Sequence, residues 1–390
     1  MKKGSKYDMN LFFVTCLLVA LGLIMVFSAS QVIGRERFSS SFFFIQRHAI
    51  RVGIGMCCLF VFMKIPFGIY RKVSVWGLGL AVMLLVSIFI WGHEARGASR
   101  WLPVFKFMLQ PVEVAKFALI IFISAWISER RKKIKDLKTG YLPVLGIVTL
   151  MAVLVILQPN VSNAALIVVL SMVLLFIGGC RIIHLVSSAG IMAAIAVPVL
   201  YSFPHVRERF SGLLDSGTDL QGPGWQLNQS LIAIGSGFIC GCGPGRGHQK
   251  YSFLPDAHTD FIYSIIGEEF GLIGTLVVLT LFIIIFKKAV GTAKRAPDTF
   301  GYLLANGIGL AIFSTAMINI SMTLGLLPVV GLPLPLVSYG GSSLVTSMAA
   351  IGILLNISSR GRKPSKRAGK DIGRSGSGIY ARRRPAKDTV

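Results

Sequence analysis

The sequence predicts an all-α polytopic membrane protein. Of its 390 residues, 54% are hydrophobic and only 14% are charged, and the mean hydropathy is +0.71. A soluble domain carries roughly 25% charged residues. Apolar runs long enough to cross about 30 Å of hydrocarbon recur along the chain. We predict ten transmembrane helices, at about 10–30, 48–65, 73–92, 110–128, 141–158, 164–180, 184–203, 261–286, 302–325 and 338–357.

The first apolar run is interpreted as an uncleaved anchor. It is about twenty residues long, which exceeds the apolar core of an ordinary signal peptide. Ser28-Ala29-Ser30 resembles a cleavage site only faintly. The predicted organisation is therefore a short N-terminal segment (1–9), a ten-helix membrane domain (10–357) and a C-terminal tail (358–390).

Basic residues predict the orientation of the helices. Lysines precede the first span, six Lys or Arg follow the fourth between 130 and 138, and eleven occur in the tail. The positive-inside rule then makes both termini cytoplasmic. Arg35, Arg37 and Arg47 in the first outside connection oppose this assignment but are outnumbered.

The net charge of +24 has a simple explanation in this topology and in the basic tail. The tail is rich in Gly, Ser, Pro and Arg and is predicted to be disordered. We expect it to contact anionic membrane headgroups, and we expect no nucleic acid as a partner. The six cysteines lack zinc-ligand spacing, so redox and zinc chemistry are not favoured.

The longest predicted outside loop spans residues 204–260, a length typical of functional loops. It contains an amphipathic stretch, Trp225 to Phe238, and then glycines 241, 243, 245 and 247. No Gly-Lys-Ser/Thr follows, so a nucleotide loop is not favoured. A set of turns and a site for a lipid diphosphate both remain open.

Polar side chains gather at the same predicted outer side of other spans. Arg100 and Trp101 precede the fourth span, and Gln110, Glu113 and Lys116 lie in its first turns. Glu113 and Lys116 are three residues apart and can form a salt bridge that only stabilises the helix. Ionisable groups at membrane depth are equally typical of a functional site.

Prolines 328, 333 and 335 interrupt the last apolar region, and Ser338 and Tyr339 begin a Ser-Tyr-Gly-Gly-Ser-Ser motif. Irregular backbone at membrane depth must be surrounded by protein or line a cavity. We predict a re-entrant segment lining a cavity, with close helix packing through small residues as the alternative.

Asp260 is the strongest single candidate for chemistry, with His258 nearby, where the long loop enters the eighth span. A carboxylate there can also cap the helix or interact with its dipole. Asp256, one turn earlier, is the alternative cap.

Four segments resemble the SEDS family of FtsW and RodA: QSLIAIGSG at 229–237, LPDAHTDF at 254–261, GEE at 267–269 and SYGGSS at 338–343. The resemblance covers about residues 10–357. It implies a ten-span peptidoglycan glycosyltransferase that polymerises lipid II, a disaccharide peptide linked to undecaprenyl diphosphate, at the outer face of the bacterial cytoplasmic membrane.

The resemblance also implies a class B penicillin-binding protein transpeptidase as partner, together with other divisome proteins. The opening segment GLIMVFSAS at 22–30 favours the division member, whereas VGLPLP at 330–335 is more similar to RodA. Asp260 matches the essential aspartate of the family. Departures from the family pattern occur at Val112, Asn160, Ser162, Asn163 and Gly247.

The mechanism expected from these residues uses Asp260 as the base for the acceptor sugar hydroxyl. Arg100, Lys116, Arg246 and Lys250 are candidates for neutralising the diphosphate, or for ion pairs that hold the loop. No motif requires a cofactor, and assistance by a divalent cation remains open. A lipid II flippase and a noncatalytic scaffold that recruits a transpeptidase are the two alternative functions.

Overall fold

The structure, a computed structural model, describes residues 7–95, 98–104, 107–214, 222–251 and 253–361. Most of the predicted basic tail lies outside these residues. The helices are α1 (Met9–Phe38), α2 (Phe43–Lys64), α3 (Gly68–Lys72), α4 (Ser74–Trp91), α5 (Pro111–Glu129), the π-helix η1 (Leu137–Tyr141), α6 (Leu142–Ile156), α7 (Val161–Ile177), α8 (Ile182–Tyr201), α9 (Pro204–Leu214), α10 (Pro223–Ser236), α11 (Ile262–Arg295), α12 (Thr299–Thr323) and α13 (Gly341–Arg360).

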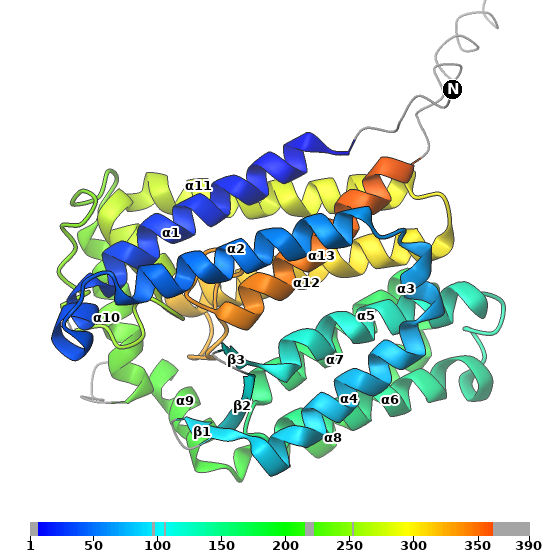
Figure 1. The fold of residues 1–390 in the computed structure, drawn as a ribbon. Coiled ribbons are helices and arrows are strands. Elements are labelled where there is room, and N and C mark those ends of the chain that lie inside the picture. Colours follow the sequence, from blue (N-terminus) through cyan, green and yellow to red (C-terminus); the bar gives the residue numbers. More distant parts are fainter. Residues whose placement is uncertain (1–6, 96–97, 105–106, 215–221, 252, 362–390) are drawn as a thin grey trace, which may run out of the picture.

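The all-α, multi-pass membrane architecture is confirmed. Within the described residues, nine helical segments are long and apolar enough to cross a membrane, and they run roughly along one direction (Figure 1). The span predicted at 164–180 corresponds to α7, which has 17 residues and is shorter than the others. The number ten therefore stays a prediction.

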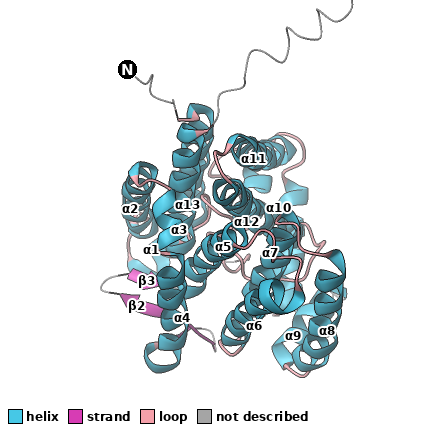
Figure 2. Cartoon of the chain, turned by 90° about the vertical axis from the view of Figure 1, so that its right-hand side faces the viewer, coloured by secondary structure: helices cyan, strands magenta, loops and turns pink. Residues whose placement is uncertain are grey.

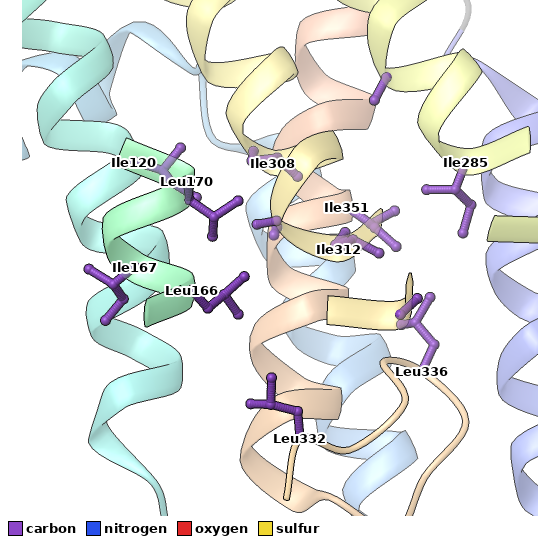
Figure 3. Packing of buried hydrophobic residues seen from close by; sticks show 14 of the residues in the cluster. Ile120, Leu166, Ile167, Leu170, Ile285, Ile308, Ile312, Leu332, Leu336 and Ile351 are labelled. Carbon is purple, nitrogen blue, oxygen red and sulfur yellow. The ribbon is translucent and has the colours of Figure 1, made fainter. Parts of the chain in front are cut away.

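The core of the bundle forms around α5, α12 and α13. Each has 72% of its most apolar window buried inside the protein, and α5 lies in the middle when the helices are viewed end-on (Figure 2). Gly307 of α12 lies against Ile120 of α5 and Leu174 of α7, which allows close approach. Apolar side chains from these helices meet in Figure 3. The window of α8 is only 11% buried, so its apolar surface faces outward, as expected for contact with lipid.

The first helix continues beyond the predicted boundary at residue 30. It ends at Phe38, and Ser39 closes it in a left-handed conformation with φ of 53°. Arg35 and Arg37 thus belong to its last turn, where positive charge interacts favourably with the helix dipole. They were predicted to lie in a connecting loop.

Helix α11 is broken at Gly271, whose φ of 64° and ψ of −160° are essentially restricted to glycine. The segment 238–243 fits against this break. The carbonyls of Glu268 and Glu269 accept from the amides of residues 242 and 243 at 3.0 and 3.1 Å, and the amides of 272–273 donate to the carbonyls of 238–239. The backbone groups freed by the break are satisfied by protein, which an apolar surrounding requires.

Three short strands before α5 were not predicted. Strands β1 (His93–Ala95), β2 (Ala98–Val104) and β3 (Phe107–Leu109) form an antiparallel sheet in the order β1-β2-β3, with Leu102 opposite Leu109. The sheet places Arg100 and Trp101 beside the entry to α5. The stretch predicted at Trp225 to Phe238 corresponds to α10, and α9 is an additional helix.

The chain between α12 and α13 is irregular, as the prolines predicted. Leu332, Leu334, Leu336 and Val337 are almost completely buried, so protein surrounds this backbone. Ser338 stabilises the turn because its Oγ accepts from the amide of Leu334 at 2.8 Å. This segment passes directly beside the turn that carries Asp260.

Candidate functional site

Asp260 lies in the turn before α11 and is held there by its backbone. The buried side-chain amide of Asn319, on α12, donates to the carbonyls of Asp260 and Leu332, both at 2.7 Å. A Cβ atom at Gly331 would lie 3.6 Å from the Asp260 Oδ2. Asn319 therefore joins three segments that are distant in sequence and brings the irregular chain to the carboxylate.

Neither Asp260 nor Asp256 occupies the cap position of α11. The N-cap is Phe261, and the first turn contains no acidic residue. Asp256 has a left-handed φ of 58°, and its carbonyl accepts from the amides of Thr259 and Phe261. The simple capping explanation for Asp260 is thus not favoured.

Two arginines interact electrostatically with Asp260. They are Arg100, on β2, and Arg209, on α9. Burial lowers the pKa of both guanidinium groups, and for Arg100 the charge of Arg209 lowers it further, whereas the negative charge of Asp260 raises both. Both arginines remain protonated at neutral pH. Among the described residues, this open cluster of Arg100, Arg209 and Asp260 holds two cations and one carboxylate, a combination that favours an anionic ligand.

Arg100 is fixed by backbone carbonyls in addition to its interaction with Asp260. Its Nε donates to the carbonyl of Gln158 at 3.3 Å, and an Nη donates to the carbonyl of Pro159. The side chain of Gln158 in turn donates to the carbonyl of Leu85 at 2.9 Å. The two backbone carbonyls therefore position the guanidinium and contribute no full negative charge of their own.

His258 and Tyr339 pack together next to Asp260. Their ring centroids lie 5.5 Å apart, and the amide of Tyr339 donates to the carbonyl of His258 at 3.0 Å. The guanidinium of Arg51 lies 4.4 Å from the Tyr339 ring centroid. Phe44 contacts both rings, at 4.8 Å from His258 and 5.4 Å from Tyr339. Of the predicted pair Ser338 and Tyr339, the tyrosine is the one surrounded by aromatic and cationic groups.

The predicted residues of α5 lie at its buried N-terminal end. The amide of Gln110 donates to the Ser342 Oγ at 2.8 Å, which joins α5 to α13. Glu113 and Lys116 form an ion pair of 3.0 Å, with side-chain exposures of only 1% and 3%. The second carboxylate oxygen of Glu113 accepts no hydrogen bond from any described residue. Trp101 pairs with His93 in the sheet.

The glycine-rich loop surrounds a second, closed cluster. Lys250 is completely buried and pairs with Glu269 at 3.0 Å, and the same carboxylate oxygen accepts from the Ser28 Oγ at 2.5 Å. The neighbouring Glu268 accepts from the amides of His248 and Gln249 at 2.6 and 3.1 Å. Lys250 is thus held away from solvent, which corresponds to the predicted alternative of an ion pair that holds the loop. Arg246 is exposed on the same loop.

A family comparison identifies the group of proteins to which the chain is related. The model of the FtsW/RodA/SpoVE family, described as cell cycle protein, matches residues 8–363. The chain belongs to this family. The resemblance seen in the sequence is thereby confirmed.

Curated members of the family are similar over nearly their whole length. A probable peptidoglycan glycosyltransferase FtsW of Trichlorobacter lovleyi is 37% identical, with 94% of this chain and 97% of the relative covered. The stage V sporulation protein E of Bacillus subtilis is also 37% identical, with coverages of 91% and 98%. The chain is thus similar both to proteins named FtsW and to a sporulation protein of the family.

Solved structures share the fold of this chain. One, described for structural coordination of polymerization and crosslinking by a peptidoglycan synthase complex, has a TM-score of 0.75 at 24% identity and covers 90% of this chain and 97% of that chain. The rod shape determining protein RodA of Thermus thermophilus has a TM-score of 0.68 at 23% identity, with coverages of 92% and 98%.

Two residues of the site were missed in the sequence. Arg209 follows Arg207 and Glu208 in the long loop, where such a charged stretch is usually solvated, and only the position of α9 brings it to Asp260. Asn319 carried a stronger signal because an amide within an apolar membrane helix needs a partner. Its low exposure and two hydrogen bonds meet that need.

Asn160 and Asn163, two of the departures from the family pattern, lie together in the structure. The side chain of Asn163 donates to the Oδ1 of Asn160 at 3.0 Å, and both residues are buried. In the part of the chain that the structure describes, no three His, Cys, Asp or Glu residues are close enough to hold a metal ion.

Proposed function

We propose that this chain is a peptidoglycan glycosyltransferase that polymerises lipid II into glycan strands for septal cell-wall synthesis. The single observation that carries the proposal is the open cluster, in which two cationic side chains interact with Asp260. A transferase acting on a lipid diphosphate needs positive charge for the leaving group and a base for the acceptor. Curated relatives named peptidoglycan glycosyltransferase FtsW support this reading.

In the proposed reaction, an acceptor sugar hydroxyl oxygen attacks the anomeric carbon of the donor. The bond from that carbon to the lipid diphosphate oxygen breaks, and the hydroxyl proton passes to the carboxylate of Asp260. A carboxylate is ionised at neutral pH, so it is able to accept this proton. Arg100 and Arg209 neutralise the charge that develops on the departing diphosphate.

The partially buried position of the two arginines strengthens this role. Charges in a medium of low dielectric interact more strongly than in water. Arg100 is held by carbonyls of the α6–α7 turn, so little reorganisation accompanies the reaction. Lys116 is engaged by Glu113 and Lys250 by Glu269, so we rank both below the arginines as diphosphate ligands.

The proposed location is the bacterial cytoplasmic membrane, with both termini cytoplasmic and Asp260 at the outer face. We propose a class B penicillin-binding protein as partner, since a structural neighbour belongs to a complex that couples polymerization and crosslinking. Other divisome proteins are proposed as further partners from the similarity to FtsW.

Other functions predict different behaviour. A lipid II flippase needs polar groups along a path across the membrane, whereas the cluster proposed as catalytic lies at one end of the bundle. A scaffold that recruits a transpeptidase would not need Asp260. An elongation role similar to that of RodA uses the same chemistry and would differ in its partner.

The test is polymerisation of lipid II by the purified protein, with and without its cognate transpeptidase, and by the Asp260→Asn variant. The substitution preserves size and removes the base. We expect the rate to fall by about 10²–10⁴-fold. A variant that folds, binds lipid II and retains more than about a tenth of the wild-type rate would exclude Asp260 as base.

Asp256→Asn is the matched control. Asparagine tolerates the left-handed conformation observed at Asp256, so the backbone is preserved. We expect turnover close to that of the wild type. An equally inactive Asp256→Asn variant would mean that the whole turn, rather than the carboxylate of Asp260, is needed.

A further inference from the structure

The connection between α1 and α2 carries an unusual cluster of aromatic side chains, at the left-hand end of the bundle in Figure 1. We define the aromatic tip as Phe38, Phe42, Phe43, Phe44 and Arg47. The rings of Phe38 and Phe43 stack at 3.6 Å, and Phe42 stacks on Phe27 of α1 at 5.6 Å. The guanidinium of Arg47 lies 4.0 Å from the centroid of Phe43. The tip is therefore a preorganised surface.

Part of this surface faces outward. Phe38 is 45% exposed and Phe42 is 58% exposed, although each stacks on another ring. Helix α1 has 30 residues and is about 45 Å long, roughly 15 Å more than the hydrocarbon core requires. With the start of α1 at the cytoplasmic boundary, its last turns project beyond the hydrocarbon.

The aromatic tip is continuous with the candidate site. Phe43 contacts Phe44 at 5.3 Å, and Phe44 contacts His258, two residues before Asp260. An unbroken series of ring contacts thus leads from exposed Phe38 to the turn that carries the proposed base. A polymer that leaves the site along this surface would meet the same rings in sequence.

The charge of the tip indicates the chemistry of its ligand. Residues 35–51 contain four arginines and a single acid, Glu36. Arg47 is exposed and forms no ion pair with a carboxylate among the described residues, so its donors are available. Aromatic rings pack against the carbon–hydrogen faces of sugars, and guanidinium groups bind carboxylates. A glycan strand bearing carboxylate-containing peptides combines both features.

We propose that the aromatic tip binds the growing glycan strand as it extends from the site, and thereby lengthens the strands made in one encounter. This inference rests on the proposed function. It assigns to the tip a role in retaining product, separate from the chemistry at Asp260.

The test compares strand length with initial rate for Phe42→Ala and Arg47→Gln, using the purified full chain, its cognate transpeptidase and lipid II. We expect strands about three- to tenfold shorter because the strand dissociates earlier. The initial rate of lipid II consumption should stay within about twofold of the wild type. Phe13→Ala is the control, since Phe13 is 67% exposed on α1 but lies near its opposite end.

The outcomes separate this inference from the proposed function. A wild-type protein that makes no glycan would overturn both the proposed function and this inference. If the wild-type protein polymerises lipid II and both tip variants give strands of normal length, only the inference is overturned. Equal shortening by Phe42→Ala and Phe13→Ala would indicate general contact of aromatic side chains with the membrane interface and would likewise overturn it.

Discussion

Two clusters of charged side chains, one buried around Lys250 and one partly buried around Asp260, differ in how their charges are compensated. In the closed cluster, Lys250 and Glu269 neutralise each other at 3.0 Å, and Ser28 supplies a further hydrogen bond. In the open cluster, Arg100 and Arg209 both interact with the carboxylate of Asp260, and no second carboxylate among the described residues raises their pKa. The closed cluster fixes a loop, whereas we propose that the open cluster keeps positive charge for a ligand.

The type of a charged residue is a poor guide to its role. Lys250 and Arg100 are both cations at the predicted outer side of the membrane, and both were candidates for binding the diphosphate. Charge compensation distinguishes them: a neutral buried pair is destabilised when one partner is lost, whereas an uncompensated cation is available to a ligand.

The largest effect is expected from Lys250→Met. The substitution leaves Glu269 buried without its cation, which should lower the free energy of unfolding by about 3–5 kcal/mol. Adding Glu269→Gln removes the uncompensated charge and should recover a large part of that loss. Thermal and chemical unfolding in detergent measures both variants.

The closed cluster would be wrongly interpreted if Lys250→Met were as stable as the wild type but failed to bind lipid II. Such a result would return Lys250 to the set of diphosphate ligands. Loss of lipid II binding only in proportion to the loss of folded protein is the expected result.

A loss of about 3 kcal/mol is expected from Gly271→Ala. The added Cβ meets the backbone carbonyl of Ile239 and the amide of Gly241, neither of which can move without losing the loop that surrounds Lys250. Gly291→Ala, in the same helix, meets nothing within 4 Å and should be neutral or stabilising by up to about 1 kcal/mol. Similar unfolding midpoints for the two variants would contradict the observed break in α11.

For the open cluster, Arg209→Gln should reduce function rather than stability. Loss of the proposed charge-assisted contact between Arg209 and the diphosphate corresponds to about 2 kcal/mol. This equals a decrease of roughly thirtyfold in kcat/KM for lipid II. The free energy of unfolding should change by less than about 0.5 kcal/mol. Arg207→Gln is the control because Arg207 is exposed, with its guanidinium 5.9 Å from the Tyr201 ring centroid. Equal effects of the two variants would remove Arg209 from the site.

The helices could be predicted from the sequence because hydrocarbon imposes long apolar runs. The break in α11, the short β-sheet and the extension of α1 could not be predicted in this way. Gly271 is one glycine inside an apolar helix pattern, and its strained conformation depends on the segment 238–243 fitting against it. The sheet at 93–109 is only three strands of three to seven residues, too short for a periodicity signal. The extension of α1 to Phe38 continues past the apolar run that predicted the helix.

The residues of the candidate site were likewise only partly predictable from the sequence. Asp260, His258 and Tyr339 could be selected because they stand next to each other in motifs or at the start of a span, and the structure brings them together. Arg209 and Asn319 are distant in sequence from Asp260 and approach it only through the packing of α9 and α12. Sequence reasoning also had no means to separate Lys250 from Arg100, since compensation is a property of three-dimensional contacts.

The smallest expected effect is a difference in thiol reactivity between two cysteines beside the closed cluster. Their labelling reports on membrane orientation and on local charge. Cys240 is exposed, whereas burial, followed by the negative charges of Glu268 and Glu269, raises the pKa of the Cys242 thiol. An impermeant maleimide applied to spheroplasts should label single-cysteine variants from outside, with Cys240 reacting first at neutral pH. A raised pKa delays formation of the reactive thiolate, so labelling of Cys242 should still increase with pH above about 8.5, the ordinary thiol value. If both sites reacted only after the cells were permeabilised, the proposed orientation would be inverted; equal rates at all pH values would show that the charges of the closed cluster do not reach Cys242.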